Sequence, residues 1–271
     1  MKHLPARFWS VVWLILPAML WFASHPASCF ASPTNAAPTE PFDYAELKLL
    51  TGTVYASGSD QKQLLFKFRR TATRDGTTVH VERRFDLPDG STGAVETITY
   101  ESGQLVAYEM KELQAGVWGT IQINPDPKNS ARQKMFIKHG HDGEARSKGS
   151  GDDLPKDTLI DDTLDPFILA HWDELLRGNS VKFHFISLEW EKAFGFKLTK
   201  ATESVVDGKP VVVVKMEPTN VLVAGFLNPL YFSFEKDGAH RLLKYVGRTT
   251  PRFKKGNAWK YLDAESVFDW K

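Results

Sequence analysis

The chain has 271 residues, of which 25% are charged, and its formal net charge is +1 at pH 7. Nucleic-acid-binding proteins normally carry a strongly basic surface, so this near-neutral balance argues against nucleic acid as a partner. Cys29 is the only cysteine, so the fold that follows must rest on its hydrophobic core and not on disulfide bonds.

The N-terminus has the pattern of an export signal. Lys2 and Arg7 precede the uncharged apolar run Phe8–Ala23, and small residues follow it. The pattern predicts a signal peptide over residues 1–31 and a soluble periplasmic or secreted product. The run is shorter than the roughly 20 residues of a membrane span, and no later segment is long enough for one. Two alternatives stay open: an uncleaved N-terminal anchor, and a lipoprotein attached through Cys29.

The segment after the predicted cleavage site differs in composition from the rest of the chain. Residues 32–43 are rich in proline and small residues, which is typical of a flexible linker. Residues 44–271 are then long enough for one sizeable domain, and their strand-like patterns predict a single antiparallel β domain.

Turn dipeptides with glycine punctuate the first part of this domain. They are Asp75-Gly76, Asp89-Gly90, Ser102-Gly103 and Ala115-Gly116. Asp-Gly supplies the positive φ that tight hairpins require. Apolar and polar residues alternate between these turns, which indicates strands with one buried and one solvated face. The residues assigned to the buried face are Leu64, Phe66, Phe68, Val79, Val81, Phe85, Val106, Tyr108 and Met110.

A second set of strands is predicted toward the C-terminus. It begins at Val181, and the run Val211–Val214 is apolar enough to be covered on both faces. Tyr231–Phe234 and Leu242–Val246 flank a turn and predict a hairpin, and Tyr261–Trp270 predicts the last strand. About ten to twelve strands are expected in all.

Two stretches interrupt the strands. Residues 140–157 are rich in Gly, Asp, Lys and Ser and predict a mobile loop. The segment Pro166–Arg177 predicts a helix, capped by Asp165 and ended by Gly178. Its apolar stripe indicates either core packing or a lid over a ligand groove, and consists of Leu164, Ile168, Trp172, Leu175 and Leu176.

These patterns predict a mainly β fold: a curved antiparallel sheet, either a half-barrel or an open barrel, with one inserted α-helix. The meander from Leu64 to Ile123, the helix Pro166–Arg177 and the closing hairpin Tyr231–Tyr245 carry a resemblance to a known group. Over most of residues 44–271 the chain resembles exported β half-barrel proteins of the LolA/LolB-like kind and related uncharacterised periplasmic domains. The resemblance implies a hydrophobic concavity suited to acyl chains, and it transfers no functional residue.

Motifs for common catalytic chemistry are missing from the sequence. We find no nucleophile elbow, zincin helix, paired CxxC motif or phosphate loop, and therefore predict no enzyme, no catalytic residue and no cofactor. His139 and His141 could face the same side of a strand, but the turn that follows is more typical of an exposed hairpin tip than of a metal site.

Two groups of carboxylates could in principle serve acid–base chemistry on glycosides. Glu189 and Glu191 flank a tryptophan, and Asp161, Asp162 and Asp165 precede the predicted helix. Spacing along the chain does not place them across a cleft, so we interpret them as solvated strand residues and helix-capping acids.

The candidate binding residues come from the helix, from an apolar stretch and from a basic segment. The stretch Val221–Tyr231 fits either a core strand with a bend or an apolar loop at the mouth of a cavity. The residues predicted to bind an apolar ligand are Phe167, Trp172, Phe226, Leu227 and Tyr231, and those predicted to bind an anionic head group are Arg248, Arg252, Lys254 and Lys255.

The first functional hypothesis is therefore a periplasmic protein that binds an apolar or lipid-like ligand in the concave face of its sheet. The second is an envelope assembly or structural factor that binds another protein, and the third is a cell-wall or polysaccharide enzyme. Bound lipid after purification favours the first hypothesis, and a stable protein complex without lipid favours the second.

Overall fold

The computed structural model describes Tyr44 and residues 49–144, 149–225 and 227–270. All of them belong to one compact unit, Thr39–Lys271. The predicted signal peptide and the linker 32–43 lie outside the described residues.

Strands make up most of this unit. The strands of the first half are β1 (Leu49–Ala56), β2 (Leu64–Asp75), β3 (Thr78–Asp86), β4 (Thr92–Glu101), β5 (Gln104–Glu112), β6 (Val117–Asp126), β7 (Asn129–His141) and β8 (Ser150–Asp153). The strands of the second half are β9 (Thr158–Leu159), β10 (Val181–Ser187), β11 (Lys192–Val206), β12 (Lys209–Pro218), β13 (Leu230–Glu235), β14 (Leu242–Arg248), β15 (Phe253–Lys255), β16 (Ala258–Lys260) and β17 (Asp263–Trp270). The helices in the described part of the chain are α1 (Asp161–Ala170), α2 (Trp172–Leu176) and α3 (Val221–Ala224).

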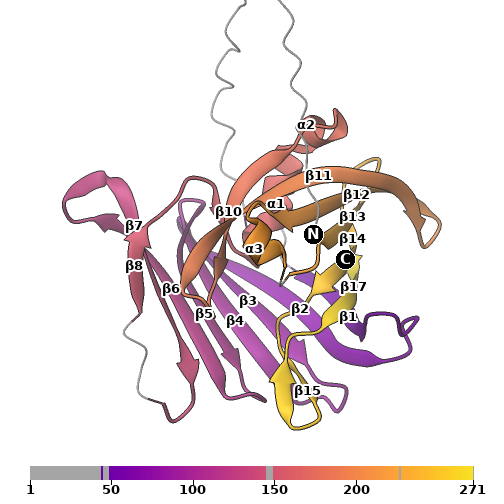
Figure 1. Ribbon diagram of the computed structural model, residues 1–271, viewed down its shortest axis with the longest axis horizontal. Helices are drawn as coiled ribbons and strands as arrows, with labels where there is room; N and C mark the ends of the chain where they lie inside the picture. The colour runs from indigo at the N-terminus through magenta and orange to yellow at the C-terminus, as the bar shows by residue number, and fades with distance from the viewer. Residues whose placement is uncertain (1–43, 45–48, 145–148, 226, 271) are drawn as a thin grey trace, which may run out of the picture. The chain divides into compact units, whose positions relative to one another are not determined.

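One large sheet contains every strand except the hairpin β15–β16. Its order is β8-β7-β6-β5-β4-β3-β2-β1-β17-β14-β13-β12-β11-β10-β9. Two meanders therefore run outward in opposite directions from the central pair β1 and β17, where Leu50 faces Trp270. Figure 1 shows the sheet curling around α1. The pairings are antiparallel except for β9 with β10, so the predicted curved antiparallel sheet is confirmed, with more strands than expected.

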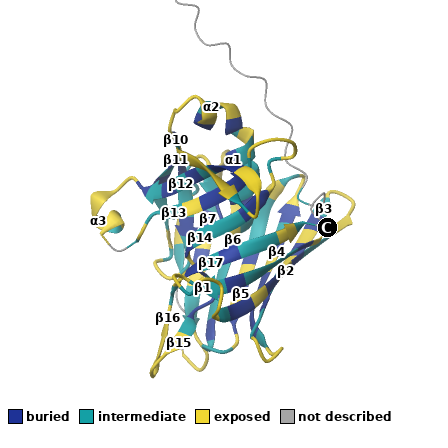
Figure 2. Ribbon diagram, turned by 90° about the vertical axis from the view of Figure 1, so that its right-hand side faces the viewer, coloured by how far each residue is buried: buried dark blue, intermediate teal, exposed yellow. Residues whose placement is uncertain are grey.

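The alternation predicted from the sequence appears as burial on the concave face. Along β4, for example, Ala94, Ile98 and Tyr100 are buried whereas Thr97 and Glu101 are exposed. Figure 2 shows buried and exposed positions alternating along the strands. The predicted turns also form: Ser102 and Gly103 have φ values of 49° and 76°, the conformation that a two-residue hairpin loop requires.

The two ends of the sheet do not pair with each other as strands. Instead, the turn between β10 and β11 contacts β7 and β8. The backbone N–H of His139 donates to Glu191 Oε1 at 3.1 Å, and the hydroxyl of Ser150 donates to the Glu191 carbonyl oxygen at 2.5 Å. Side-chain contacts thus hold the open side of the curved sheet together.

The helical segment differs from the prediction in its start and its continuity. The helix begins at Asp161 and not at Asp165, because the hydroxyl of Thr163 accepts from the Ile160 N–H and donates to the Ile160 carbonyl, both at 2.9 Å. Pro166 lies within α1, where its missing N–H removes one helical hydrogen bond without ending the helix. A break at His171 separates α1 from α2. Gly178, with φ of 83°, ends the helical segment as predicted.

Two further segments differ from the expectation. Residues 140–157 were expected to be a mobile loop, but Ser150–Asp153 pairs with β7 as strand β8. Val221–Tyr231 was expected as a bent core strand or as an apolar loop at the mouth of a cavity. Its first residues form the short helix α3, because the side chain of Asn220 caps the Leu222 N–H at 2.8 Å, and Val223, Leu227 and Leu230 line a cavity. Val221 and Leu222 are 86% and 77% exposed, so α3 is no part of the core. No helix in the described part of the chain is long and apolar enough to cross a bilayer.

Candidate functional site

A cavity of about 740 Å³ lies on the concave side of the sheet, beside α1. Strands from both meanders supply its wall, because inward-facing positions of β1, β2, β3, β5 and β6 oppose those of β10 to β14 and β17. The wall is mainly aromatic and aliphatic, and its apolar members include Leu50, Val54, Phe68, Phe85, Met110, Phe185, Phe196, Met216, Phe232, Phe234 and Phe268. A cavity of this size and character suits an elongated apolar ligand.

Of the predicted apolar binding residues, Leu227 lines this cavity. Tyr231 does not, because Leu230 and Phe232 occupy the inward phase of β13 and Tyr231 points to the other face, where it is exposed. Phe226 lies outside the described residues.

The two predicted helix residues pack into the protein and not against the cavity. Trp172 is 7% exposed, stacks on His240 at 4.5 Å between ring centroids and meets Phe234 edge-on at 5.8 Å. Phe167 is partly buried against Phe183 at 5.5 Å. Trp172 therefore belongs to the core, whereas Leu164 of the same stripe lines the cavity and Leu176 is 40% exposed, so neither interpretation holds for the whole stripe.

The four predicted basic residues are not gathered at one rim. Arg248 lines the cavity. Arg252 is buried, with Nη1 3.0 Å from Glu112 Oε1 and its guanidinium 4.3 Å from the centre of the Tyr261 ring. Lys254 and Lys255 are exposed on β15 and do not line the cavity.

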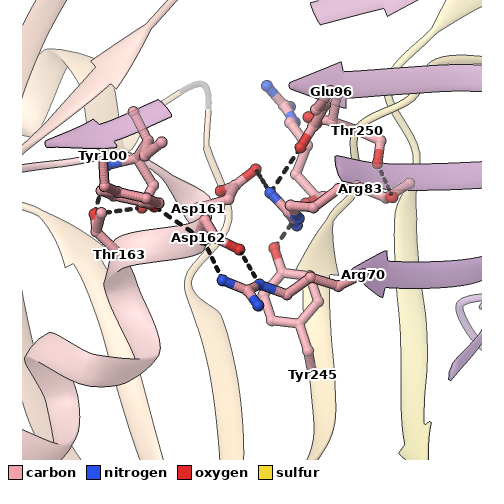
Figure 3. A network of polar contacts seen from close by, with 12 residues as sticks. Arg70, Arg83, Glu96, Tyr100, Asp161, Asp162, Thr163, Tyr245 and Thr250 are labelled. Carbon is pink, nitrogen blue, oxygen red and sulfur yellow. Dashed lines mark hydrogen bonds and ion pairs between the residues drawn. The ribbon is translucent and has the colours of Figure 1, made fainter. Parts of the chain in front are cut away.

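The polar part of the cavity wall comes from the start of α1 and from β2 and β3. Figure 3 shows acidic side chains of α1 directed at arginines of the sheet. Arg70 donates to both carboxylate oxygens of Asp162, from Nε at 2.7 Å and from Nη2 at 2.9 Å. The Tyr100 hydroxyl donates to Asp162 Oδ2 at 2.9 Å. Burial raises the pKa of Asp162, but the hydrogen bonds and charge of Arg70 outweigh that effect and hold it below its usual range.

Arg83 lies between two further carboxylates. Its Nη1 is 2.7 Å from Glu96 Oε2 and 3.7 Å from Asp161 Oδ2. Glu96 is fully buried, and burial raises its pKa to about 7 despite the charge of Arg83. The short contact to Arg83 is an ion pair, and Tyr108 interacts with the same carboxyl group and lowers its pKa.

Asp165 completes the polar wall one helical turn after Asp161. No hydrogen bond or ion pair to its carboxylate occurs within the described part of the chain. Burial, and then repulsion from Asp162, raises the pKa of Asp165 to about 7, against the opposing charges of Arg83 and Arg70. A carboxyl group that titrates near neutral pH thus faces the cavity.

This polar cluster was missed by the sequence analysis, which interpreted the three aspartates as capping acids. The strand alternation nevertheless contained a signal. Arg70 falls in the same phase as Phe66 and Phe68, and Arg83 in the same phase as Val81 and Phe85, so period-two counting places both arginines on the buried face. A buried arginine normally requires a buried carboxylate, which α1 supplies.

The remaining candidates are two glutamates and two histidines. Glu189 and Glu191 lie in the turn between β10 and β11 and not on a strand as expected. Glu189 lines the cavity, with an oxygen 3.9 Å from Arg252 Nη2. His139 and His141 lie on β7 with ring centroids 6.2 Å apart. Within residues 49–144, 149–225 and 227–270, no three His, Asp or Glu side chains are grouped to hold a metal ion.

The fold and the site together define a curved antiparallel β protein with an internal, mainly apolar cavity and one charged wall. No protein-family model matches the sequence, and no curated protein matches it. Among solved structures, the chain is similar to a β-barrel-like protein of the domain of unknown function DUF1849 from Brucella abortus. The identity is 9% and the TM-score 0.39, over 82% of this chain and 97% of the other.

A second solved structure with some likeness is a DUF1329 family protein from Desulfovibrio piger, at 11% identity and a TM-score of 0.23, over 82% of this chain and 83% of the other. Both superpositions are loose, so neither transfers a ligand or an activity to this chain. The architecture implied by the LolA/LolB-like resemblance, a curved antiparallel sheet around a helix, is present in the structure, whereas kinship with those carriers stays a prediction.

Proposed function

We propose that this chain is a non-enzymatic binding protein that holds an apolar, lipid-like ligand in the cavity of its sheet. The observation that carries the proposal is the cavity of about 740 Å³ with its aromatic and aliphatic wall. Small-molecule sites typically have volumes of roughly 300–1,000 Å³ and combine an apolar lining with a few polar groups that orient the ligand.

The energetics favour an acyl or alkyl chain over a sugar or nucleotide. Each methylene removed from water contributes about 0.8 kcal/mol, so ten methylenes contribute roughly 8 kcal/mol before the entropic cost of binding is subtracted. A sugar would instead leave many hydroxyl groups facing Phe, Leu and Met side chains, and each unpaired polar group is costly to bury. The wall is formed mainly by paired strands, so little ordering should be needed on binding.

The proposal is tested by titrating the purified protein with the neutral fluorophore N-phenyl-1-naphthylamine and displacing it with 1-dodecanol. Leu227→Asp places a carboxylate on the cavity wall and should weaken binding at least about tenfold, since a charge facing an apolar ligand must be desolvated. Leu222→Asp is the matched control, because it makes the same change five positions earlier on the exposed side of α3, outside the cavity wall.

Saturable binding by the wild type and by Leu222→Asp, but not by Leu227→Asp, is the expected result. Thermal unfolding of both variants checks that they remain folded. Absence of saturable binding in the wild type, or equal binding by both variants, contradicts the proposal. Mass spectrometry of an organic extract of the folded protein provides independent evidence, because a ligand acquired in the cell should appear there.

A further inference from the structure

Around the first turns of α1, carboxyl groups outnumber guanidinium groups, although Arg241, Arg248 and Glu189 also line the cavity elsewhere. Glu96, Asp161, Asp162 and Asp165 supply four carboxyl groups, and Arg70 and Arg83 supply two guanidinium groups. The tyrosines that face the cluster add no compensating charge. Burial raises the pKa of each of them, so they stay neutral near pH 7, and they are Tyr44, Tyr100, Tyr108 and Tyr245.

Both arginines of the cluster are already engaged. Arg70 forms the two-pronged pair with Asp162, and Arg83 lies between Glu96 and Asp161. The carboxyl groups beyond these pairs lie on α1 and beside Arg83, and burial raises the pKa of Glu96, Asp161 and Asp165, so their negative charge is only partly developed near pH 7. Glu96 is fully buried behind the cavity wall, where Arg83 and Tyr108 contact it.

Besides the Asp162 that pairs with Arg70, the carboxyl groups of α1 that reach the cavity are Asp161 and Asp165. They are four residues apart and so lie on the same face of α1. The Asp161 side chain is 43% accessible although α1 lies inside the curved sheet, and it lines the cavity. Asp165 lines the cavity without a partner in the described part of the chain. Leu169, one turn further along α1, also lines it, so this face of the helix changes from acidic to apolar.

We propose that this face of α1 is a head-group subsite, and that the cavity prefers an amphiphile whose head group is an ammonium or similar cation held by Asp161 and Asp165. The inference rests on the proposed function, since it names the chemistry of the ligand's head group. An ammonium group has three donors that can reach the carboxylate oxygens of Asp161 and Asp165, and its charge favours their ionised form. An anionic head group would oppose that form instead.

The pKa of Asp165, raised to about 7, supports the same assignment. A cation beside Asp165 favours its ionised form, so the affinity for an alkylammonium should rise between pH 6 and pH 8 as Asp165 loses its proton. An alkylamine keeps its own proton in this range, because amine pKa values lie near 10.4. The affinity for an alkyl carboxylate should fall over the same range. The other charged groups that act on Asp165 are Asp162, Arg83, Arg70 and Asp161.

The test compares three ligands with the same chain length: dodecylamine, dodecanoate and 1-dodecanol, each displacing N-phenyl-1-naphthylamine from the purified protein. The wild type should bind dodecylamine about tenfold or more tightly than dodecanoate at pH 8, the factor that one charge-assisted hydrogen bond provides. Asp165→Asn should lose this preference and the pH dependence while keeping its affinity for 1-dodecanol. Asp173→Asn is the matched control, because Asp173 lies on α2 outside the cavity wall, and it should behave like the wild type.

The outcomes separate the two proposals. Binding of 1-dodecanol with dodecanoate held as tightly as dodecylamine overturns the head-group inference and leaves the proposed function standing, with Arg248 as the group to examine for anions. A full preference for dodecylamine in Asp165→Asn also overturns it. Failure of the wild type to bind any of the three overturns the proposed function itself. Should Asp165→Asn bind none of them, Asp161→Asn carries the same comparison, and retention of the preference there counts against the inference.

Discussion

The replacement Asp165→Asn should stabilise the protein at alkaline pH. The pKa of Asp165 is raised from 3.8 to about 7, chiefly because burial opposes its charge and because Asp162 repels it. In the unfolded chain the same group titrates near 3.9. The folded state therefore binds this proton more tightly than the unfolded state does, and ionising Asp165 above neutral pH costs folding free energy.

The expected gain in the free energy of unfolding follows from the shift in the pKa of Asp165. A change from 3.8 to about 7 is roughly three pKa units, and each unit corresponds to about 1.36 kcal/mol, which gives an upper value of about 4 kcal/mol. Asp165 faces a cavity wide enough for water, which screens part of its charge, so we expect a gain of about 2–4 kcal/mol for Asp165→Asn near pH 8.

The effect of Asp165 on the free energy of unfolding is confined to a definite pH range. The stability that the raised pKa provides is fully present below about pH 4 and is lost as the pH rises through 7. Asparagine does not ionise, so the advantage of the variant should be large near pH 8 and absent near pH 4. Glu96, with its pKa also raised to about 7, should leave a residual fall of stability with pH in both proteins.

Urea unfolding followed by tryptophan fluorescence, at several pH values between about 4 and 8, measures the difference directly. Asp173→Asn, the same chemical change outside the cavity, controls for general charge effects. A variant no more stable than the wild type near pH 8, or one whose advantage is the same near pH 4, would refute the reasoning.

Three further predictions follow from the core, the ion pairs and the N-terminus. Trp172→Ala should lower the free energy of unfolding by about 3–5 kcal/mol, because the ring is packed against Phe234 and His240; a loss below about 1 kcal/mol in a urea titration would show that it is not a core residue. Arg70→Met should cost about 3–5 kcal/mol by leaving the Asp162 charge buried and unpaired, and adding Asp162→Leu should recover most of the loss in the same assay. N-terminal sequencing of the protein from an extracytoplasmic fraction should begin within a few residues of Ser32, and a cytosolic product that begins near Met1 contradicts the proposed export.

Many of the strands and turns are predictable from local sequence patterns. Alternation over Phe66 and Phe68, or over Val79 and Val81, identifies the buried face because successive strand residues point to opposite sides. Gly103 marks a hairpin because the turn requires positive φ. These are local properties of a few neighbouring residues, and the C-terminal hairpin of β13 and β14 was predictable for the same reason.

Two local signals in the sequence are each compatible with the start of the helix. Asp165 and Pro166 fit a helix N-terminus well, yet the helix begins at Asp161, where the Thr163 hydroxyl bonds both backbone groups of Ile160. Local propensity did not decide between them, because burial of Leu164 and Ile168 against the sheet also stabilises the earlier turn.

Which distant segments meet depends on the three-dimensional packing of the chain. The last strand pairs with the first, and Arg70 pairs with Asp162 across 92 positions of the chain. Period-two counting places Arg70 and Arg83 on the inner face, but it does not say which carboxylates neutralise them, or that Asp161 and Asp165 are left facing a cavity. Those outcomes depend on how the sheet curves around α1, since charge balance and cavity volume are properties of three-dimensional packing and not of spacing along the chain.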